Sequence, residues 1–345
     1  DGHIPSQWKY EAFLPIRETT EPVTLNEGGT ELYEAPTLSV ELGVETLVKD
    51  DGHCPTGVLK DRASSVSVTK AREHDQEIVT CASTGNAAAS LAAYAARAGL
   101  DSTSFVPSRA NFANKAMINV HGGEMNVVGG RYGDAAAAFE EASEDGGWYP
   151  LDAFGTPYRH EGAKTLAYEL VADLGGAPDA MVHPVGHGTG FLGLFRGFRE
   201  LEATGTIEAL PRLYAAQPEG CAPIVDAHEA GTSEPGPVES PDTISGPLEV
   251  PDPAGGSYAL DAIEATSGGE VTLDAETSSF SLFAVVEADD ESASQTDTAT
   301  EGDQQSEETT DTDDDDGGAP IVPLVVGLLA VVAVSGAVYY LRDGE

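Results

Sequence analysis

The sequence is poor in positive charge. Its 345 residues include 17 Lys and Arg but 59 Asp and Glu, so the formal net charge at pH 7 is −42. Nucleic-acid phosphates are bound through Lys and Arg, so this balance excludes a nucleic-acid partner. The acidic excess is typical of a halophilic protein, because self-repulsion is screened over about 3 Å at roughly 1 M salt. An ordinary acidic protein with an acidic tail is the alternative.

Cysteine is scarce as well. Cys54, Cys81 and Cys221 are widely spaced and form no Cys-x-x-Cys pair. The sequence therefore indicates neither a metal site nor a disulfide framework, and a reducing compartment fits. Residues 1–10 are polar, and they contain no apolar signal-peptide core.

The C-terminal third lacks Lys and Arg from Leu213 to Leu341. Residues 288–318 hold 13 acidic residues, which predicts a disordered acidic linker, because such a segment buries too little apolar surface to offset its ordering entropy. The next run, 321–341, has no charge and would span roughly 30 Å as a helix, the thickness of a bilayer core. We expect a transmembrane helix over 319–341 that anchors a cytoplasmic catalytic domain to the membrane. A buried core helix is the alternative.

The remainder is rich enough in apolar residues for a large core. Strand-like runs alternate with longer helical segments, which predicts an α/β fold with parallel sheets covered on both faces. The expected strands are 38–42, 45–49, 77–82, 103–106, 125–128, 180–185 and 212–217. The expected helices are 60–73, 86–97, 114–121, 134–143, 161–174 and 191–203.

Lys60 is the strongest candidate for a catalytic residue. It follows a turn bracketed by Pro55 and Gly57 and opens a helix, with apolar neighbours before it and Arg62 after it. A lysine that attacks a carbonyl must be deprotonated near neutral pH, which requires partial burial or a nearby positive charge. A surface lysine at a helix start is the alternative.

Two further segments are suited to bind anions. Ser83, Thr84, Gly85 and Asn86 precede an alanine-rich helix, where backbone N–H groups would bind a substrate carboxylate. A simple Ser or Thr N-cap is the alternative for this segment. The second segment has three glycines that let the backbone approach an anion, and its residues are Gly186, His187, Gly188, Thr189 and Gly190. With a nucleophilic lysine, these are the parts of a pyridoxal-phosphate site.

In this order, the three segments resemble the fold-type-II pyridoxal-phosphate enzymes. The triplet Lys60-Asp61-Arg62 is similar to that of threonine synthases, and the resemblance runs from about Trp8 to Glu276. It implies a catalytic domain over 1–276 with two open parallel-sheet lobes, as in tryptophan synthase β chains, the smaller lobe covering about 86–148. A short strand-like segment, 277–287, then precedes the acidic linker.

The resemblance also implies roles for residues. Lys60 would bind pyridoxal 5′-phosphate covalently, Asn86 would contact its ring hydroxyl oxygen, and residues 186–190 would hold its phosphate. His187 departs from the family pattern and would either donate to the phosphate or face solvent. Lys115 and Arg159 are candidates for binding the substrate's phosphate, with an ordinary salt bridge as the alternative for each.

The implied reaction converts O-phospho-L-homoserine and water to L-threonine and phosphate, so the expected partner is a small amino-acid phosphate. A homodimer is compatible with the resemblance. One family feature is missing, because no Glu-Pro-Ala-Ser-Ala-like run that contacts the pyridine nitrogen follows residue 276. A dehydratase, a cysteate-type synthase and a truncated inactive membrane-anchored fusion are therefore the alternatives.

Overall fold

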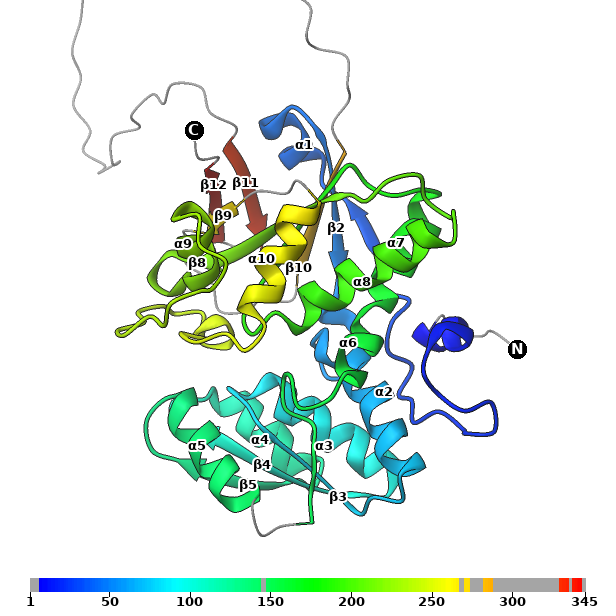
Figure 1. The fold of residues 1–345 in the computed structure, drawn as a ribbon, viewed down its shortest axis with the longest axis vertical. Helices are drawn as coiled ribbons and strands as arrows, with labels where there is room; N and C mark the ends of the chain where they lie inside the picture. The colour runs from blue at the N-terminus through cyan, green and yellow to red at the C-terminus, as the bar shows by residue number, and fades with distance from the viewer. Residues whose placement is uncertain are drawn as a thin grey trace, which may run out of the picture.

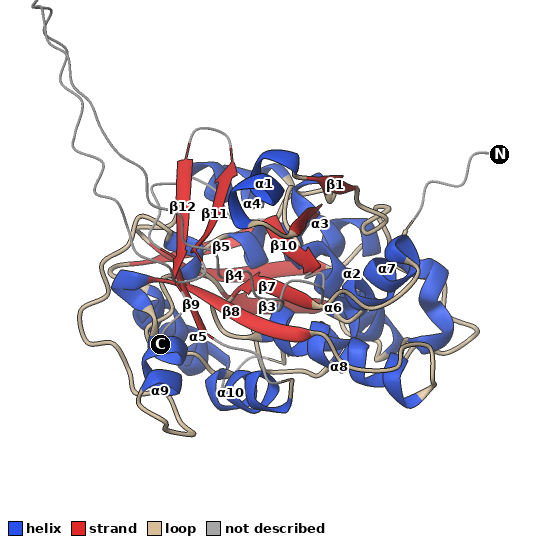
Figure 2. Cartoon of the chain, turned by 90° about the horizontal axis from the view of Figure 1, so that it is seen from above, coloured by secondary structure: helices blue, strands red, loops and turns tan. Residues whose placement is uncertain are grey.

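Two α/β lobes make up the chain, as a computed structural model shows (Figure 1). The structure describes residues 6–143, 147–266, 270–273, 282–287, 329–334 and 337–342. The predicted acidic linker, 288–318, lies outside these residues. Figure 2 shows helices on the outside of the strands in both lobes, as the alternating pattern predicts.

The smaller lobe contains a four-stranded, wholly parallel sheet in the order β5-β4-β3-β6. Its strands are β3 (Ile78–Ala82), β4 (Asp101–Pro107), β5 (Glu124–Val128) and β6 (Tyr149–Pro150). Its helices are α3 (Asn86–Ala98), α4 (Phe112–Val120) and α5 (Tyr132–Ser143). Ligands bind beyond the carboxyl ends of parallel strands, so the loops after β3, β4 and β5 are positioned to form one side of a site.

The larger lobe contains a six-stranded mixed sheet in the order β1-β2-β10-β7-β8-β9. Its strands are β1 (Leu32–Glu34), β2 (Glu45–Asp50), β7 (Ala180–Pro184), β8 (Arg212–Pro218), β9 (Glu270–Leu273) and β10 (Leu282–Glu287). Strands β7, β8 and β9 are parallel, whereas β10 runs antiparallel to both β2 and β7. The expectation of parallel sheets therefore holds for the smaller lobe and for only half of the larger one.

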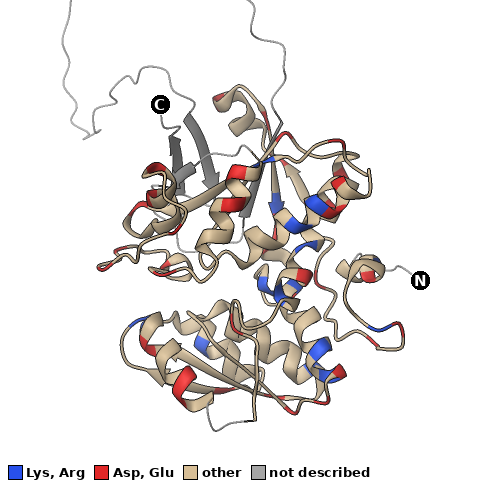
Figure 3. Cartoon of the chain, viewed as in Figure 1, with Lys and Arg blue, Asp and Glu red and all other residues tan. Residues whose placement is uncertain are grey.

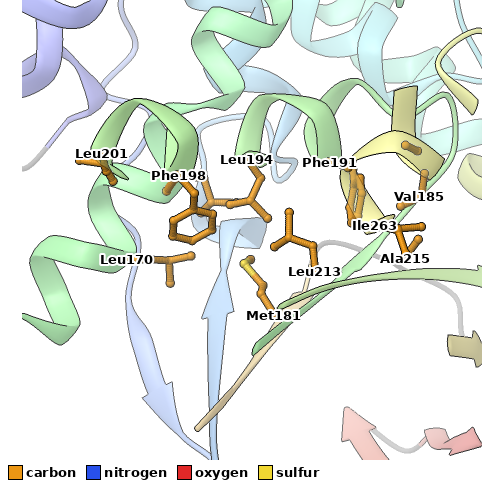
Figure 4. Close-up of a cluster of buried hydrophobic side chains, with 14 of the residues drawn as sticks. Leu170, Met181, Val185, Phe191, Leu194, Phe198, Leu201, Leu213, Ala215 and Ile263 are labelled. Atoms are coloured by element: carbon orange, nitrogen blue, oxygen red, sulfur yellow. The ribbon is translucent and has the colours of Figure 1, made fainter. Parts of the chain in front are cut away.

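Helix α8 (Thr189–Ala203) covers the larger sheet. Phe191, Leu194 and Phe198 lie on one face of this helix and are fully buried. Figure 4 shows them directed at Met181 of β7 and Leu213 of β8. This packing fixes the start of α8 at the carboxyl end of β7. The remaining helices of this lobe are α1 (Pro36–Leu42), α7 (Thr165–Leu174), α9 (Pro223–Glu229) and α10 (Gly256–Ala265).

Helices α2 (Lys60–Glu73) and α6 (Tyr158–Ala163) join the lobes. They approach so closely that a Cβ on Gly162 would lie 2.8 Å from the Cα of Ala63. The adjacent Arg62 is buried and pairs with Asp51 and Glu169, at 2.7 Å in both cases. Basic residues gather in this central region in Figure 3, whereas acidic ones are spread over both lobes.

Two local predictions were wrong. The strand expected over 38–42 is the helix α1, because Pro36 starts a helical turn and Gly43 ends it in a left-handed conformation. The helix expected over 161–174 is split into α6 and α7.

Of the transmembrane helix expected over 319–341, residues 319–328 and 335–336 lie outside the described residues, and the described remainder is extended. Residues Leu329–Val334 and Ala337–Arg342 form the antiparallel strands β11 and β12. β-branched and aromatic residues make up half of each strand, and these residue types favour extended structure. None of the helices in the described part of the chain has the length and apolar character needed to cross a bilayer.

Candidate active site

The three predicted segments meet in one cavity between the lobes. Lys60 enters it from the start of α2, Thr84 and Asn86 from the loop after β3, and residues 186–190 from the loop after β7. The resemblance required that residue 60 and the 186–190 loop share a small ligand, and the fold places them around the same space. Asp152, Arg159 and His183 line the cavity as well.

Lys60 has the electrostatic environment of a nucleophile. Burial of its amine, assisted by the positive charge of Arg159, lowers the pKa of Lys60 to about 8. A substantial fraction of the amine is therefore neutral near pH 8, as attack on a carbonyl requires. The sequence suggests substrate binding or a salt bridge for Arg159, and the structure adds a lowering of the Lys60 pKa.

The loop 186–190 has the form of an anion cradle. Gly188 has a left-handed φ of 93°, and a Cβ there would lie 3.2 Å from the carbonyl oxygen of Gly255. A Cβ on Gly190 would lie 3.0 Å from the His183 ring. The loop ends at the N-terminus of α8, where backbone N–H groups and the helix dipole favour a phosphate. The cradle therefore fits the phosphate of the cofactor.

His187 contacts the opposite lobe. Its ring lies edge-on to Tyr132 at the start of α5, with centroids 4.7 Å apart. Burial, with the positive charges of Lys60 and Arg159, lowers the pKa of His187 to about 4, so the ring is neutral at pH 7. Its Nε2 atom is buried and has no partner among the described residues. The structure thus adds a contact between lobes to the two roles considered from the sequence.

The 83–86 segment contains both a helix cap and open groups. The Oγ of Ser83 accepts hydrogen bonds from the N–H groups of Gly85 (3.0 Å) and Ala88 (3.3 Å), as an N-cap does. Thr84 and Asn86 face the cavity, and the Oδ1 of Asn86 accepts from Asn114 at 2.8 Å. Gly85 adopts a φ of 135°, which side chains rarely allow.

Of the two basic candidates, the fold brings only Arg159 to Lys60. Arg159 is 2% exposed, donates from Nη1 to the carbonyl oxygen of Leu151, and has a buried Nε without a partner among the described residues. Lys115 lines neither cavity of the cleft, and its Nζ donates to the carbonyl oxygen of Ser108 at 2.8 Å.

The residues that follow Lys60 do not face the cavity. Asp61 accepts from the N–H of Thr56 at 2.7 Å and from Ser90 at 2.6 Å, so it fixes the turn before the helix. Arg62 belongs to the buried ion pairs between α2 and α7. Within the triplet, only Lys60 is in reach of a ligand.

Sequence reasoning missed Arg109 and Arg131. Both line the outer part of the cleft, where they pair with Glu249 after the short 3₁₀ helix Gly246–Leu248. One signal was present, because each arginine lies within a few residues of the end of a predicted strand. Glu249 follows no such element, and only the fold brings it to the cleft.

Comparison with known proteins decides the family. A family model described as "pyridoxal-phosphate dependent enzyme" matches residues 23–279. The chain belongs to this family. Its cofactor is pyridoxal 5′-phosphate. Lys60, Asn86 and the 186–190 cradle, the residues expected to bind it, line one cavity.

Threonine synthases are among the similar curated proteins. Those of Methanosarcina acetivorans and Methanocaldococcus jannaschii are each 37% identical over 76% of this chain. This pyridoxal-phosphate enzyme spans about 65% of the length of both relatives. The threonine synthase of Halalkalibacterium halodurans is 35% identical over 81% of this chain and 78% of its own.

Solved structures show the same fold at lower identity. Maize serine racemase matches with a TM-score of 0.62 and 18% identity over 70% of each chain. Threonine deaminase isoform 2 of Solanum lycopersicum matches with a TM-score of 0.60 and 21% identity, over 70% of this chain and 64% of its own. Similarity at this level indicates the architecture alone.

Proposed function

We propose that this enzyme converts O-phospho-L-homoserine and water to L-threonine and phosphate. Its similarity to threonine synthases supports this reaction. The observation that carries the proposal is Arg159, a buried cation beside Lys60 with a free N–H donor. Among the described residues Asp152 acts on this charge from the same cavity but forms no ion pair with it. A buried charge that lacks an ion pair is costly, so the site favours an anionic ligand.

Each group has a role in the reaction. The cofactor supplies an electron sink for charge that develops on the substrate carbons. The Lys60 amine accepts and returns protons at those carbons. Arg159 binds the substrate's phosphate and stabilises it as it leaves, while the N–H groups at the start of α3 orient the carboxylate. The two lobes exclude stray water until water adds at the β carbon.

Purified holoenzyme tests this proposal. We expect phosphate release from O-phospho-L-homoserine with equimolar threonine, and loss of both in Lys60→Ala. Arg159→Met should retain the cofactor's absorbance band but lose most of the activity. Release of ammonia and a 2-oxo acid from threonine, without phosphate release from the phosphoester, would support a dehydratase instead. Absence of a cofactor band would support an inactive fusion.

We also infer membrane attachment through residues 319–341, with the catalytic lobes in the cytoplasm. The uncharged run 321–341 supports attachment, and the three widely spaced cysteines fit a reducing compartment. Fractionation of cells, followed by protease treatment of intact cells, tests it. A chain that stays in the supernatant contradicts attachment, and loss of the lobes to external protease contradicts the cytoplasmic placement. Cross-linking at low concentration would test the homodimer expected from the resemblance.

A further inference from the structure

A second, larger cavity of about 750 Å³ forms the mouth of the cleft. It shares Val58, Thr84, Asn86, Tyr132 and Pro247 with the cavity around Lys60, so the two adjoin. A ligand in this mouth therefore lies next to the cavity that holds Lys60.

Three charged side chains meet at the mouth from the two lobes. Arg109 follows β4 and Arg131 precedes α5, so both belong to the smaller lobe. Glu249 belongs to the larger lobe, and its Oε1 pairs with Arg131 and lies 3.6 Å from the Nη1 of Arg109. Two guanidinium groups therefore share one carboxylate oxygen.

The two arginine side chains are much more exposed to solvent than the glutamate. Glu249 is 12% exposed, whereas Arg109 is 55% and Arg131 is 42% exposed. Each guanidinium has five N–H donors, and the described residues give the two guanidinium groups no side-chain acceptor besides Glu249. Most of their donors therefore remain available to a ligand in the mouth.

We propose that Arg109 and Arg131 form an anion-binding site that takes a phosphate group by displacing Glu249. A phosphate offers three oxygens and nearly two negative charges to the paired guanidinium groups, against one carboxylate charge. Asp242 is the other acidic residue of this lining, and its negative charge opposes tight retention of the anion. The site attracts a phosphate-bearing ligand to a molecule whose net charge would repel it.

This inference deepens the proposed function and rests on it for the identity of the ligand. The alternative is an ion pair that only holds the lobes together. The two cases predict opposite effects of removing the Glu249 charge on phosphate binding. In an anion site Glu249 competes with phosphate, whereas in a purely structural ion pair it holds the arginines in place.

Binding of inorganic phosphate to the holoenzyme, followed by calorimetry, separates the two. The measurement uses an Arg159→Met background, which removes the inner anion site. We expect Arg131→Gln to weaken binding about tenfold, as for loss of a hydrogen bond to a charged group, and Glu249→Gln to tighten it. Arg131→Lys should restore part of the loss. Arg97→Gln, an exposed arginine at the end of α3, is the matched control and should change nothing.

Two results would overturn the inference. One is phosphate binding that is equal in all variants, and the other is a change in the same direction for Arg131→Gln and Glu249→Gln. Because the readout is binding, it stands even if no threonine is formed. The Arg131→Gln variant with Arg159 intact then identifies the ligand. A raised KM for O-phospho-L-homoserine at unchanged kcat identifies the substrate. An unchanged KM with a raised inhibition constant for phosphate identifies the released product.

Discussion

Lys60 and Arg159 place two positive groups in one cavity of a strongly acidic chain. Burial lowers the pKa of Arg159, but a guanidinium remains protonated in proteins, so the arginine keeps its charge. The lysine instead loses its proton more readily, because its pKa is lowered to about 8. One residue is thus a permanent cation, and the amine of the other is partly neutral near pH 8.

The pH dependence of the rate at which apoenzyme binds the cofactor should reveal the effect of Arg159 on the pKa of Lys60. Only the neutral amine attacks the aldehyde, so the capture rate of apoenzyme should rise with pH and level off above about 8, well below the 10.5 of an ordinary lysine. Arg159→Met should move the midpoint upward, because a neighbouring positive charge disfavours the protonated amine. Stopped-flow absorbance measures the rate. Lys115→Met is the control, and an equal shift in it would remove Arg159 as the cause.

At the scale of elements, the cradle depends on a loop far away in the sequence. The N–H of Gly255, just before α10, donates to the carbonyl oxygen of His187 at 3.0 Å. A Cβ on Gly255 would lie 2.6 Å from that oxygen and would overlap the Phe154 ring. Thr189 is held in turn by the carbonyl oxygen of Ala153, at 3.1 Å.

Gly255→Ala should therefore loosen the grip on the cofactor's phosphate. We expect its affinity for pyridoxal 5′-phosphate to fall at least about tenfold, the loss expected when backbone donors to a charged group are misplaced. Affinity for pyridoxal, which lacks the phosphate, should change little. Fluorescence titration of apoenzyme gives both constants. Gly176→Ala is the control, because among the described residues no atom beyond its chain neighbours lies within 4 Å of the added Cβ. An equal loss for both ligands would indicate general misfolding.

The buried ion pairs between α2 and α7 make a second prediction. Burial alone would raise the pKa of Glu169, but Arg62 and Lys49 outweigh it and hold that pKa at about 2. Glu169→Gln leaves Arg62 short of a buried counter-charge, so we expect a loss of roughly 3–5 kcal/mol in the free energy of unfolding.

Urea denaturation measures that loss. Glu200→Gln serves as the comparison, because Glu200 is 39% exposed and its partner Lys164 also pairs with Glu161. Its removal should cost about 1 kcal/mol or less. Similar losses in the two variants would show that burial does not set the strength of the Arg62 network.

Local patterns predicted most elements but not the whole site. The helix at Lys60 and the strand before Ser83 lie within a residue of their predicted positions, because turn and glycine signals bound them. Helices α9 and α10 were missed, since short helices after a proline or glycine give little periodicity. Arg109, Arg131 and Glu249 could not be grouped from the sequence, because about 140 residues of chain separate the first from the last.

At the scale of the molecule, the large negative net charge is expected to control how the stability of the folded state depends on salt. The sequence carries −42, and Figure 3 shows acidic residues over the outside of both lobes. Folding brings these charges together, so repulsion opposes the compact state unless salt screens it.

We expect the thermal midpoint to rise as KCl increases from 0.1 M to about 1 M, because the screening length falls from about 10 Å to about 3 Å. Differential scanning calorimetry measures it. NaCl at equal ionic strength should act alike if screening is the cause. A midpoint that is insensitive to salt would favour an ordinary acidic protein.

The triplet Lys60-Asp61-Arg62 divides its work between chemistry and scaffold. Only its first residue reaches a ligand, while the second fastens a turn and the third anchors two helices. Proteins that share this triplet should therefore share the junction between the lobes, even where their substrates differ. Differences in substrate specificity should instead lie at the mouth of the cleft, among residues that no short motif contains.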